Sequence, residues 1–359
     1  MIDFADLVTT VLDSGASDLH LAVGAPPVMR RHGELVPIGK HILTSQDTRE
    51  LVYGILTQDL RQRLETNLEI DFSYQVPGRA RFRVNAYYQR AVLGCAFRVV
   101  PTDLKTLAEL KLPTSIGDWT TKPRGLVLVT GPTGSGKSTT LAALIDEINT
   151  TRSCHIITIE DPIEFLHRHK RSLINQRELG GDTHSFAAAL RSALRQDPDV
   201  ILVGEMRDLE TIQIALTAAE TGHLVFGTLH TSDAPQTVDR VIDVFPPHQQ
   251  EQVRIMLANA LQGVCCQQLI PTVHGGRVVA VEVLMATPAV RNLIREGKTH
   301  QIYSMLQTGS QHGMVSMDAS LATLVRQGAI TKHLALERAG SPAELKRILD
   351  GGPVEAKAA

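Results

Sequence analysis

Residues 131–138 read Gly-Pro-Thr-Gly-Ser-Gly-Lys-Ser and fit the pattern G-x-x-x-x-G-K-[ST]. The apolar run before them predicts a strand, and the residues after them predict a helix. In this setting the glycines let backbone N–H groups curl around phosphate oxygens, Lys137 can reach the outer phosphates, and Ser138 can ligate Mg²⁺. A chance glycine-rich turn is the alternative, and both flanks argue against it. The residues predicted to bind a nucleotide are Gly131, Thr133, Gly134, Ser135, Gly136, Lys137, Ser138 and Thr139.

Acidic residues follow two later strands. Glu164 comes after the apolar strand predicted at 156–159, and Glu205 comes after the one predicted at 200–203. Because the carboxyl ends of parallel strands meet at one edge of a sheet, these carboxylates could hold a metal through water and polarise an attacking water. Solvated surface acids are the alternative. A third predicted strand brings His230 to the same edge, where it could sense a γ-phosphate or be merely structural.

The pattern of apolar residues predicts an α/β fold in the second part of the chain. Near-continuous apolar strands alternate with helical segments after residue 125, which is typical of a parallel sheet covered on both faces. Past residue 286 the pattern becomes helical, and Ser341-Pro342 followed by Glu344 starts a final helix. Before residue 101 helices and alternating strands indicate a mixed α+β unit, in which Thr44 and Asp47 predict a capping box.

The length of 359 residues, at about 150 residues per domain, predicts two units. Three prolines between 101 and 123 indicate a linker and lead-in. The predicted parts are an N-terminal domain at 1–102, a linker at 103–116, an α/β domain with C-terminal helices at 117–352, and a frayed tail at 353–359.

Composition excludes some functions. With 36 Lys and Arg against 38 Asp and Glu, the net charge is -2, so no basic field gathers nucleic acid, and aromatics at 4% offer few stacking platforms. We therefore expect no nucleic-acid partner. The four cysteines lack C-x-x-C spacing, which fits a reducing cytosol. No apolar run approaches the roughly 18 residues that span a bilayer, so any membrane association is expected to be peripheral.

Five motifs, in order, resemble those of the PilT-type retraction ATPases of the type IV pilus, within the secretion ATPase superfamily. Besides 131–138 they are Ile-Glu-Asp-Pro-Ile-Glu at 159–164, Asp-Pro-Asp-Val-Ile-Leu-Val-Gly-Glu-Met-Arg-Asp at 197–208, Thr-Ala-Ala-Glu-Thr-Gly-His at 217–223 and Gly-Thr-Leu-His-Thr at 227–231. The resemblance implies a PAS-like N-terminal domain, a RecA-like ATPase domain, and a homohexameric motor that hydrolyses ATP with Mg²⁺.

The same resemblance implies roles for individual residues. Glu164 is then the catalytic base, Glu205 supports Mg²⁺ through water, and His230 is the histidine-box residue. Residues 289–296, Ala-Val-Arg-Asn-Leu-Ile-Arg-Glu, resemble a segment tied to retraction in the family. From the residues alone this segment predicts one buried helix face, formed by Val290, Leu293 and Ile294.

The family resemblance also implies partners and a location. The expected location is the cytoplasm, peripheral at the inner face of the cytoplasmic membrane, where an inner-membrane platform protein of the pilus is the expected partner. In such rings the first domain of one subunit packs beside the nucleotide of another. Arg83 and Arg98, on predicted strands of the first domain, are therefore candidate arginine fingers acting in trans. Solvated arginines on a strand face are an equally weighted alternative.

Three other functions stay open at this point. A RecA-type nucleic-acid motor would share the phosphate loop, but the composition disfavours it. A module that holds ATP without hydrolysing it would also share the loop. Pilus extension and type II secretion motors of the same superfamily usually carry a tetracysteine zinc insert and extra N-terminal domains, neither of which is seen in this sequence.

Overall fold

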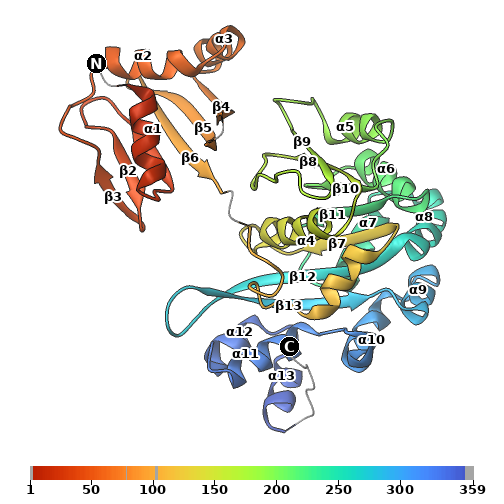
Figure 1. Cartoon of the computed structure of the whole chain (residues 1–359). Coiled ribbons are helices and arrows are strands. Elements are labelled where there is room, and N and C mark those ends of the chain that lie inside the picture. The colour runs from red at the N-terminus through yellow and green to blue at the C-terminus, as the bar shows by residue number, and fades with distance from the viewer. Residues whose placement is uncertain (1–2, 78, 102–103, 352–359) are drawn as a thin grey trace. The chain divides into compact units, whose positions relative to one another are not determined.

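Two units of different fold make up the chain in the computed structural model (Figure 1). The structure describes residues 3–77, 79–101 and 104–351. The units are Met1–Thr102 and Asp103–Ala359. The predicted frayed tail at 353–359 lies outside the described residues.

The first unit is an α+β fold. Its elements are α1 (Phe4–Asp13), β1 (Asp18–Leu21), β2 (Val28–Arg31), β3 (Glu34–Pro37), α2 (Ser45–Ile55), α3 (Gln58–Asn67), β4 (Glu69–Val76), β5 (Ala80–Gln89) and β6 (Val92–Val100). The strands pair antiparallel in the order β3-β2-β1-β6-β5-β4. One sheet face, which includes the fully buried Phe82 and Phe97, packs against the three helices in a single core. The predicted capping box of Thr44 and Asp47 is present at the start of α2.

A row of charged residues crosses the same sheet. In the strand register Arg83 lies opposite Arg98, Arg98 opposite Asp18, and Asp18 opposite Arg30. Arg98 Nε donates a hydrogen bond to Asp18 Oδ1 at 2.9 Å. Burial alone would raise the pKa of Asp18, but hydrogen bonds from Ser17 and Arg98 outweigh it and the pKa is lowered. The buried Asp18 carboxylate thus offsets the charge of one of two adjacent arginines.

The second unit is an α/β fold with added helices. Its strands are β7 (Gly125–Thr130), β8 (His155–Glu160), β9 (Leu173–Glu178), β10 (Val200–Val203), β11 (Leu224–Leu229), β12 (Leu261–Pro271) and β13 (Arg277–Met285). Its helices are α4 (Lys137–Thr151), α5 (Phe186–Ala193), α6 (Leu209–Glu220), α7 (Ala234–Asp243), α8 (Pro247–Ala260), α9 (Pro288–Arg295), α10 (Ile302–Thr308), α11 (Met317–Arg326), α12 (Lys332–Arg338) and α13 (Pro342–Leu349), with 3-10 turns at Thr114–Thr121, Thr299–Gln301 and Ser310–His312.

Both faces of the second sheet are covered, as the apolar strands predicted. The strand order is β13-β12-β7-β11-β10-β8-β9, with every pair parallel except β12 and β13. Alternate residues of β7 point to opposite cores: Leu126 and Leu128 pack with α5–α8, while Val127 and Val129 pack with α4 and Trp119. The carboxyl ends of β7, β8, β10 and β11 therefore meet at one edge, where ligands bind in such sheets.

The segment predicted as a linker contributes to this core. Leu112 is 9% exposed, and Ile116 and Trp119 are fully buried against β7 and α4. The lead-in to the second unit is thus packed from about residue 112 onward.

The sequence analysis did not predict the antiparallel hairpin β12–β13. Gln267 and Gln268 interrupt the apolar run of β12, so the segment lacks a strand pattern. In the structure Gln267 is buried, and its Nε2 donates to Thr140 Oγ1 on α4 at 2.9 Å. The fold thus supplies the amide nitrogen with a partner 127 residues away. The hairpin makes the edge of the sheet antiparallel, which departs from the all-parallel expectation.

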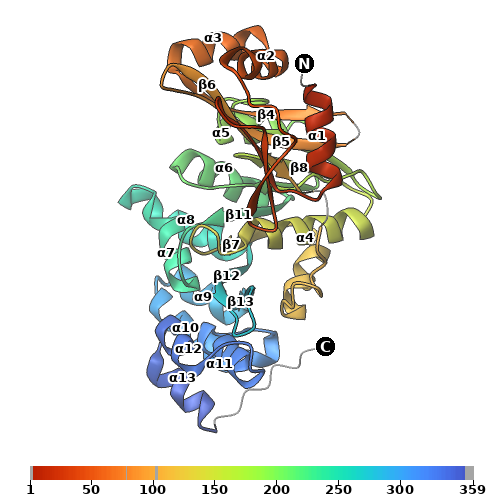
Figure 2. The ribbon, with the colours of Figure 1, turned by 90° about the vertical axis from the view of Figure 1, so that its left-hand side faces the viewer.

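Helices α9–α13 lie beside the hairpin at one end of the second unit (Figure 2). Ser341 caps α13 by accepting the N–H of Glu344, as predicted. In α9, Val290 and Ile294 are fully buried and Leu293 is partly buried, which confirms the predicted apolar face. Across the described ranges, none of the helices combines the length and apolar character that crossing a bilayer requires.

Candidate functional site

The phosphate loop, residues 131–136, joins the end of β7 to the start of α4. Gly136 has φ 93°, and among the described residues no side chain caps the first N–H groups of α4. By contrast, Asp208 and Asp233 cap α6 and α7, which follow neighbouring strands. Uncapped N–H groups at the positive end of a helix dipole favour an anion. The start of α4 is therefore suited to bind phosphate.

Close packing beneath the loop fixes its shape. Gly131 has φ 136°, and a Cβ there would lie 2.3 Å from the carbonyl oxygen of Gln267 on β12. Ser135 is 2% exposed, and its hydroxyl has no hydrogen-bond partner within the described part of the chain. A buried hydroxyl without a partner is costly. This hydroxyl is thus an unused donor within the loop where we expect phosphate to bind.

Lys137 is held against the loop by backbone carbonyls. Its Nζ donates to Gly131 O at 2.8 Å and to Pro132 O at 3.1 Å. Burial lowers the pKa of Lys137, while the negative charges of Glu205 and Glu164 partly offset that effect. Both carboxylates therefore lie within electrostatic range of the lysine.

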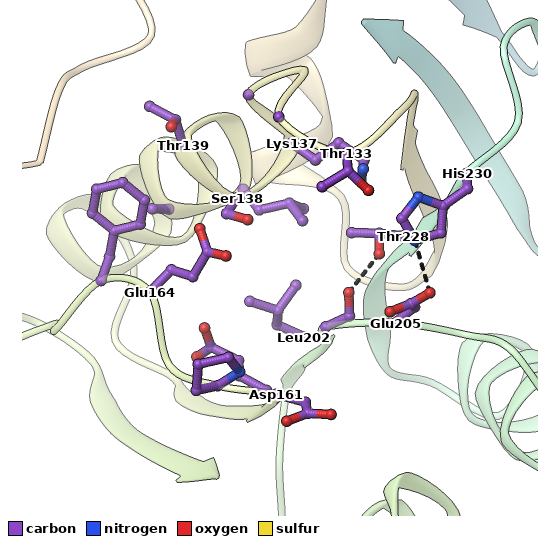
Figure 3. A pocket seen from close by; sticks show the side chains of 18 of the residues that line it. Thr133, Lys137, Ser138, Thr139, Asp161, Glu164, Leu202, Glu205, Thr228 and His230 are labelled. Carbon is purple, nitrogen blue, oxygen red and sulfur yellow. Dashed lines mark hydrogen bonds and ion pairs between the residues drawn. The ribbon is translucent and has the colours of Figure 1, made fainter. Parts of the chain in front are cut away.

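These groups surround one cavity of about 530 Å³ at the carboxyl edge of the second sheet (Figure 3). Figure 3 shows Ser138 and Glu164 on one side of the cavity and Glu205 and His230 on the other. The predicted residues that line it are Thr133, Gly134, Gly136, Lys137, Ser138, Thr139, Glu164, Glu205 and His230. Gly131 and Ser135 belong to the same loop but lie beneath its inner surface.

Glu205 follows β10, and two side chains, His230 and Arg207, donate hydrogen bonds that orient it. His230 Nε2, at the end of β11, donates to Glu205 Oε1 at 2.8 Å, and Arg207 Nε also donates to that oxygen. Burial would raise the pKa of Glu205, but Arg207 and His230 lower it overall. Thr228 donates to the carbonyl of Gly204, which further ties the two strand ends together. Glu205 is therefore ionised and fixed in place.

Glu164 lies on the loop after β8, which two other carboxylates hold. Glu160 accepts hydrogen bonds from Thr158 Oγ1 at 2.6 Å and from the backbone N–H of Glu164. Burial raises the pKa of Glu160, and these bonds oppose the rise. Glu178 Oε2 accepts the N–H of Ile163 at 3.0 Å. The loop is thus anchored at Ile163 and at Glu164 itself.

Arg83 and Arg98 belong to the first unit, on β5 and β6, and both side chains are exposed. Within that unit they lie next to each other across the two strands. The fold therefore brings the two arginines together, and Arg98 also bonds to Asp18.

Sequence reasoning missed several residues of the cavity. Arg207 stands inside a quoted motif, and its spacing of two residues from Glu205 was the available signal. Leu269 and Arg277 come from the hairpin that was not predicted, so no signal pointed to them. Burial lowers the pKa of His167 to about 4, so this ring is neutral at physiological pH. Two aromatic side chains of the lining, Phe165 and Phe186, were also not predicted.

The chain is similar to known proteins along most of its length. Residues 109–275 match the family model described as "Type II/IV secretion system protein". The chain is 53% identical over 341 residues to the type IV pilus retraction ATPase PilT of Pseudomonas aeruginosa, covering 95% of this chain and 99% of that protein. The chain belongs to the PilT family. It is 53% identical over 334 residues to a twitching motility protein of Neisseria gonorrhoeae, covering 93% and 89% of the two chains.

A solved structure supports the PilT-family assignment. The crystal structure of the pilus retraction motor PilT with bound ADP superimposes with a TM-score of 0.90 at 49% identity and covers 97% of this chain and 100% of that one. The chain is therefore an ATP-hydrolysing enzyme with a nucleotide site.

The structure gives a physical account of the family segment at 289–296. Arg291 Nε donates to Ala286 O at 3.0 Å, and its Nη1 donates to Ala258 O and to Asn259 O, at 2.7 Å for the latter. These last two carbonyls lie at the C-terminal end of α8, where a cation is favourable. Burial lowers the pKa of Arg291, with a smaller effect from Arg295. Arg291 thus joins α9 to the end of α8.

The unpaired hydroxyl of Ser135 leads to a test. We expect Ser135→Ala to leave the unfolding free energy of the nucleotide-free protein unchanged or raise it by about 1 kcal/mol, because no hydrogen bond is lost. The rise in Tm caused by ADP should become smaller. Chemical and thermal unfolding with and without ADP measure both effects.

Ser316→Ala is the matched control. Ser316 is 5% exposed and caps α11 by accepting the N–H of Ala319, so its loss should cost about 1 kcal/mol. A comparable loss for Ser135→Ala without nucleotide would contradict the account.

Proposed function

We propose that the chain is a homohexameric motor ATPase that powers retraction of the type IV pilus and twitching motility. The observation that carries this proposal is the convergence of the phosphate loop, Glu164 and the Glu205–His230 pair on one cavity. The names of the Pseudomonas and Neisseria relatives support the pilus process.

Mg²⁺ fits the oxygen donors of the site. Ser138 would hold it through its hydroxyl and Glu205 would hold it through water, because hydroxyl and carboxylate oxygens are ligands that Mg²⁺ prefers. When bound, the ion supplies positive charge against the phosphate oxygens. The lowered pKa of Glu205 supports this role, since it keeps the carboxylate charged.

Glu164 is the proposed general base, which takes a proton from the water that attacks the γ-phosphate of ATP. Its carboxylate faces the cavity from a loop that Glu160 and Glu178 anchor. Lys137 would leave the carbonyls of the loop and bind the outer phosphates, where its charge stabilises the transition state. His230 holds Glu205 in position on the opposite side.

Arg83 and Arg98 are proposed to act in trans, toward the nucleotide of a neighbouring subunit. Two exposed arginines side by side on one sheet supply the fixed positive charge that phosphoryl transfer needs. The hydrogen bond from Arg98 to Asp18 keeps one of them oriented.

We further propose that the ring works in the cytoplasm, peripheral at the inner face of the cytoplasmic membrane, with an inner-membrane platform protein of the pilus as its partner. The family membership supports this association.

Two substitutions test the catalytic assignment. We expect Glu164→Gln to bind ATP but lower kcat by about 100-fold or more, as loss of a general base does, and Lys137→Ala to abolish hydrolysis. Phosphate release by the purified hexamer measures this, with Glu251→Gln on the exposed face of α8 as the unchanged control. Undiminished turnover in either variant would overturn the site. DNA-stimulated turnover would instead favour a nucleic-acid motor.

Mixed rings test action in trans. We expect Arg83→Ala and Arg98→Ala to lower kcat, and Arg63→Ala on exposed α3 to leave it unchanged. Subunits carrying Lys137→Ala retain both arginines but cannot hydrolyse ATP. Mixing them with the Arg83→Ala, Arg98→Ala double variant should restore turnover if the arginines serve a neighbour. Mixed rings as inactive as their parents would rule out the trans assignment.

Deletion of the chromosomal copy tests the cellular role. We expect more surface pili and no twitching, because retraction stops while extension continues. The wild-type chain should restore twitching, and the Glu164→Gln chain should not. Loss of pili on deletion would contradict retraction and favour an extension or secretion motor.

A further inference from the structure

Glu282 is a buried carboxylate that the mechanism above does not use. It lies on β13, opposite Cys266 on β12, and is 3% exposed. Its Oε1 accepts the backbone N–H of Ala234 at 2.8 Å, and the carboxylate also accepts the backbone N–H of Met317. A buried charge normally needs such partners.

Each of these two N–H groups is the first of a helix. Ala234 begins α7 and Met317 begins α11. A carboxylate is favoured at a helix N-terminus because of the uncapped N–H groups and the helix dipole. One side chain therefore holds the starts of two helices that are far apart in the sequence.

The start of α7 lies four residues after His230. Thr231 Oγ1 lies 2.7 Å from Oγ1 of Thr237 in the first turn of α7, and Thr237 donates to the carbonyl of Asp233 at 2.7 Å. The segment from His230 to Asp233 thus joins the end of β11, which is fixed by its pairing with β7, to the helix start that Glu282 holds. A shift of that helix start would move His230 relative to Glu205.

The start of α11 connects Glu282 to the C-terminal helices. Val283 and Val315 exchange two backbone hydrogen bonds beside it, at 2.8 and 3.0 Å. The neighbouring Asp318, 1% exposed, accepts from Tyr303 of α10 at 3.1 Å and from the N–H of Ser341 at 3.0 Å. Helices α10, α11 and α13 are therefore linked to the strand that carries Glu282.

The charge of Glu282 is costly in this place. Burial raises its pKa to about 7, and the N–H groups of Ala234 and Met317 oppose the rise. The carboxylates of Asp233, which caps α7, and of Asp318 on α11 add to it. The charge of Glu282 also contributes to the raised pKa values of three nearby groups, Cys265 and Cys266 on β12 and Tyr303 on α10.

We propose that Glu282 is a positioning residue for ATP hydrolysis, which holds the start of α7, and through it His230, in line with Glu205 and couples them to the C-terminal helices. The inference rests on the proposed function, because it needs His230 and Glu205 to act in hydrolysis. Two N–H donors face the carboxylate, which accepts both. A carboxamide or a protonated carboxyl carries a donor of its own and no negative charge, so it matches two N–H donors less well.

Glu282→Gln in the full-length hexamer is the test. We expect kcat to fall about tenfold or more, as when the support of an active-site residue is lost, while the KM for ATP stays unchanged because the phosphate loop is not touched. Wild-type kcat should carry a component that rises with pH through about 7, as Glu282 ionises, and the variant should lack that component. Glu337→Gln, at an exposed position of α12, is the control.

A second readout separates positioning from folding. The raised folded pKa means that Glu282 stabilises the wild type fully below its ordinary value of 4.5, and that this contribution is lost as pH rises through about 7. The unfolding free energy of Glu282→Gln should not show this decrease with rising pH, so the variant is expected to be at least as stable as the wild type at pH 8.

Equal kcat and an equal pH profile in wild type and variant would overturn the role of Glu282. A variant with a raised KM and unchanged kcat would overturn it too. Absence of turnover in the wild type would instead overturn the proposed function, so the two failures are distinguishable.

Discussion

The uncapped start of α4 is the constraint on which the rest of the structure depends. Its backbone N–H groups need an anion, and the loop that exposes them can form because Gly131 tolerates contact with the Gln267 carbonyl. That contact places the hairpin β12–β13 directly beneath the loop. The parallel sheet then brings the ends of β8, β10 and β11 to the same cavity. The order of the strands in the sheet thus also determines which side chains surround the phosphate site.

Carboxylates surround this positive end, and each proposed catalytic acid has its own support. Glu205 is oriented by His230 and Arg207, while Glu160 accepts the N–H of Glu164. Glu282 holds the start of α7 in the same way, by accepting the N–H of Ala234. Buried carboxylates that accept backbone N–H groups fix short loops, and these donors offset part of the cost by which burial raises the pKa of Glu160 and Glu282. These carboxylates therefore contribute to holding the site in place, together with Lys137.

Features that depend on neighbours in the sequence could be predicted, and features that depend on distant elements could not. The strand, loop and helix at 126–148 and the caps at Thr44 and Ser341 involve neighbours in the sequence, so the pattern revealed them. The hairpin was missed because Gln267 interrupts its apolar pattern, and Thr140, which accepts from the buried Gln267 Nε2, is a partner that only the fold supplies. The anchoring of Glu164 and the burial of Glu282 depend on distant elements in the same way.

The central claim is that the N–H groups of the loop hold a triphosphate with Glu164 opposite its end. The most direct measurement is a crystal structure of the full-length ring with Mg²⁺ and a non-hydrolysable ATP analogue. The account predicts phosphates at the start of α4, Lys137 released from the carbonyls of Gly131 and Pro132, and Glu164 facing the γ-phosphate. An analogue bound elsewhere, or Lys137 still bonded to its own loop with the nucleotide present, would contradict it.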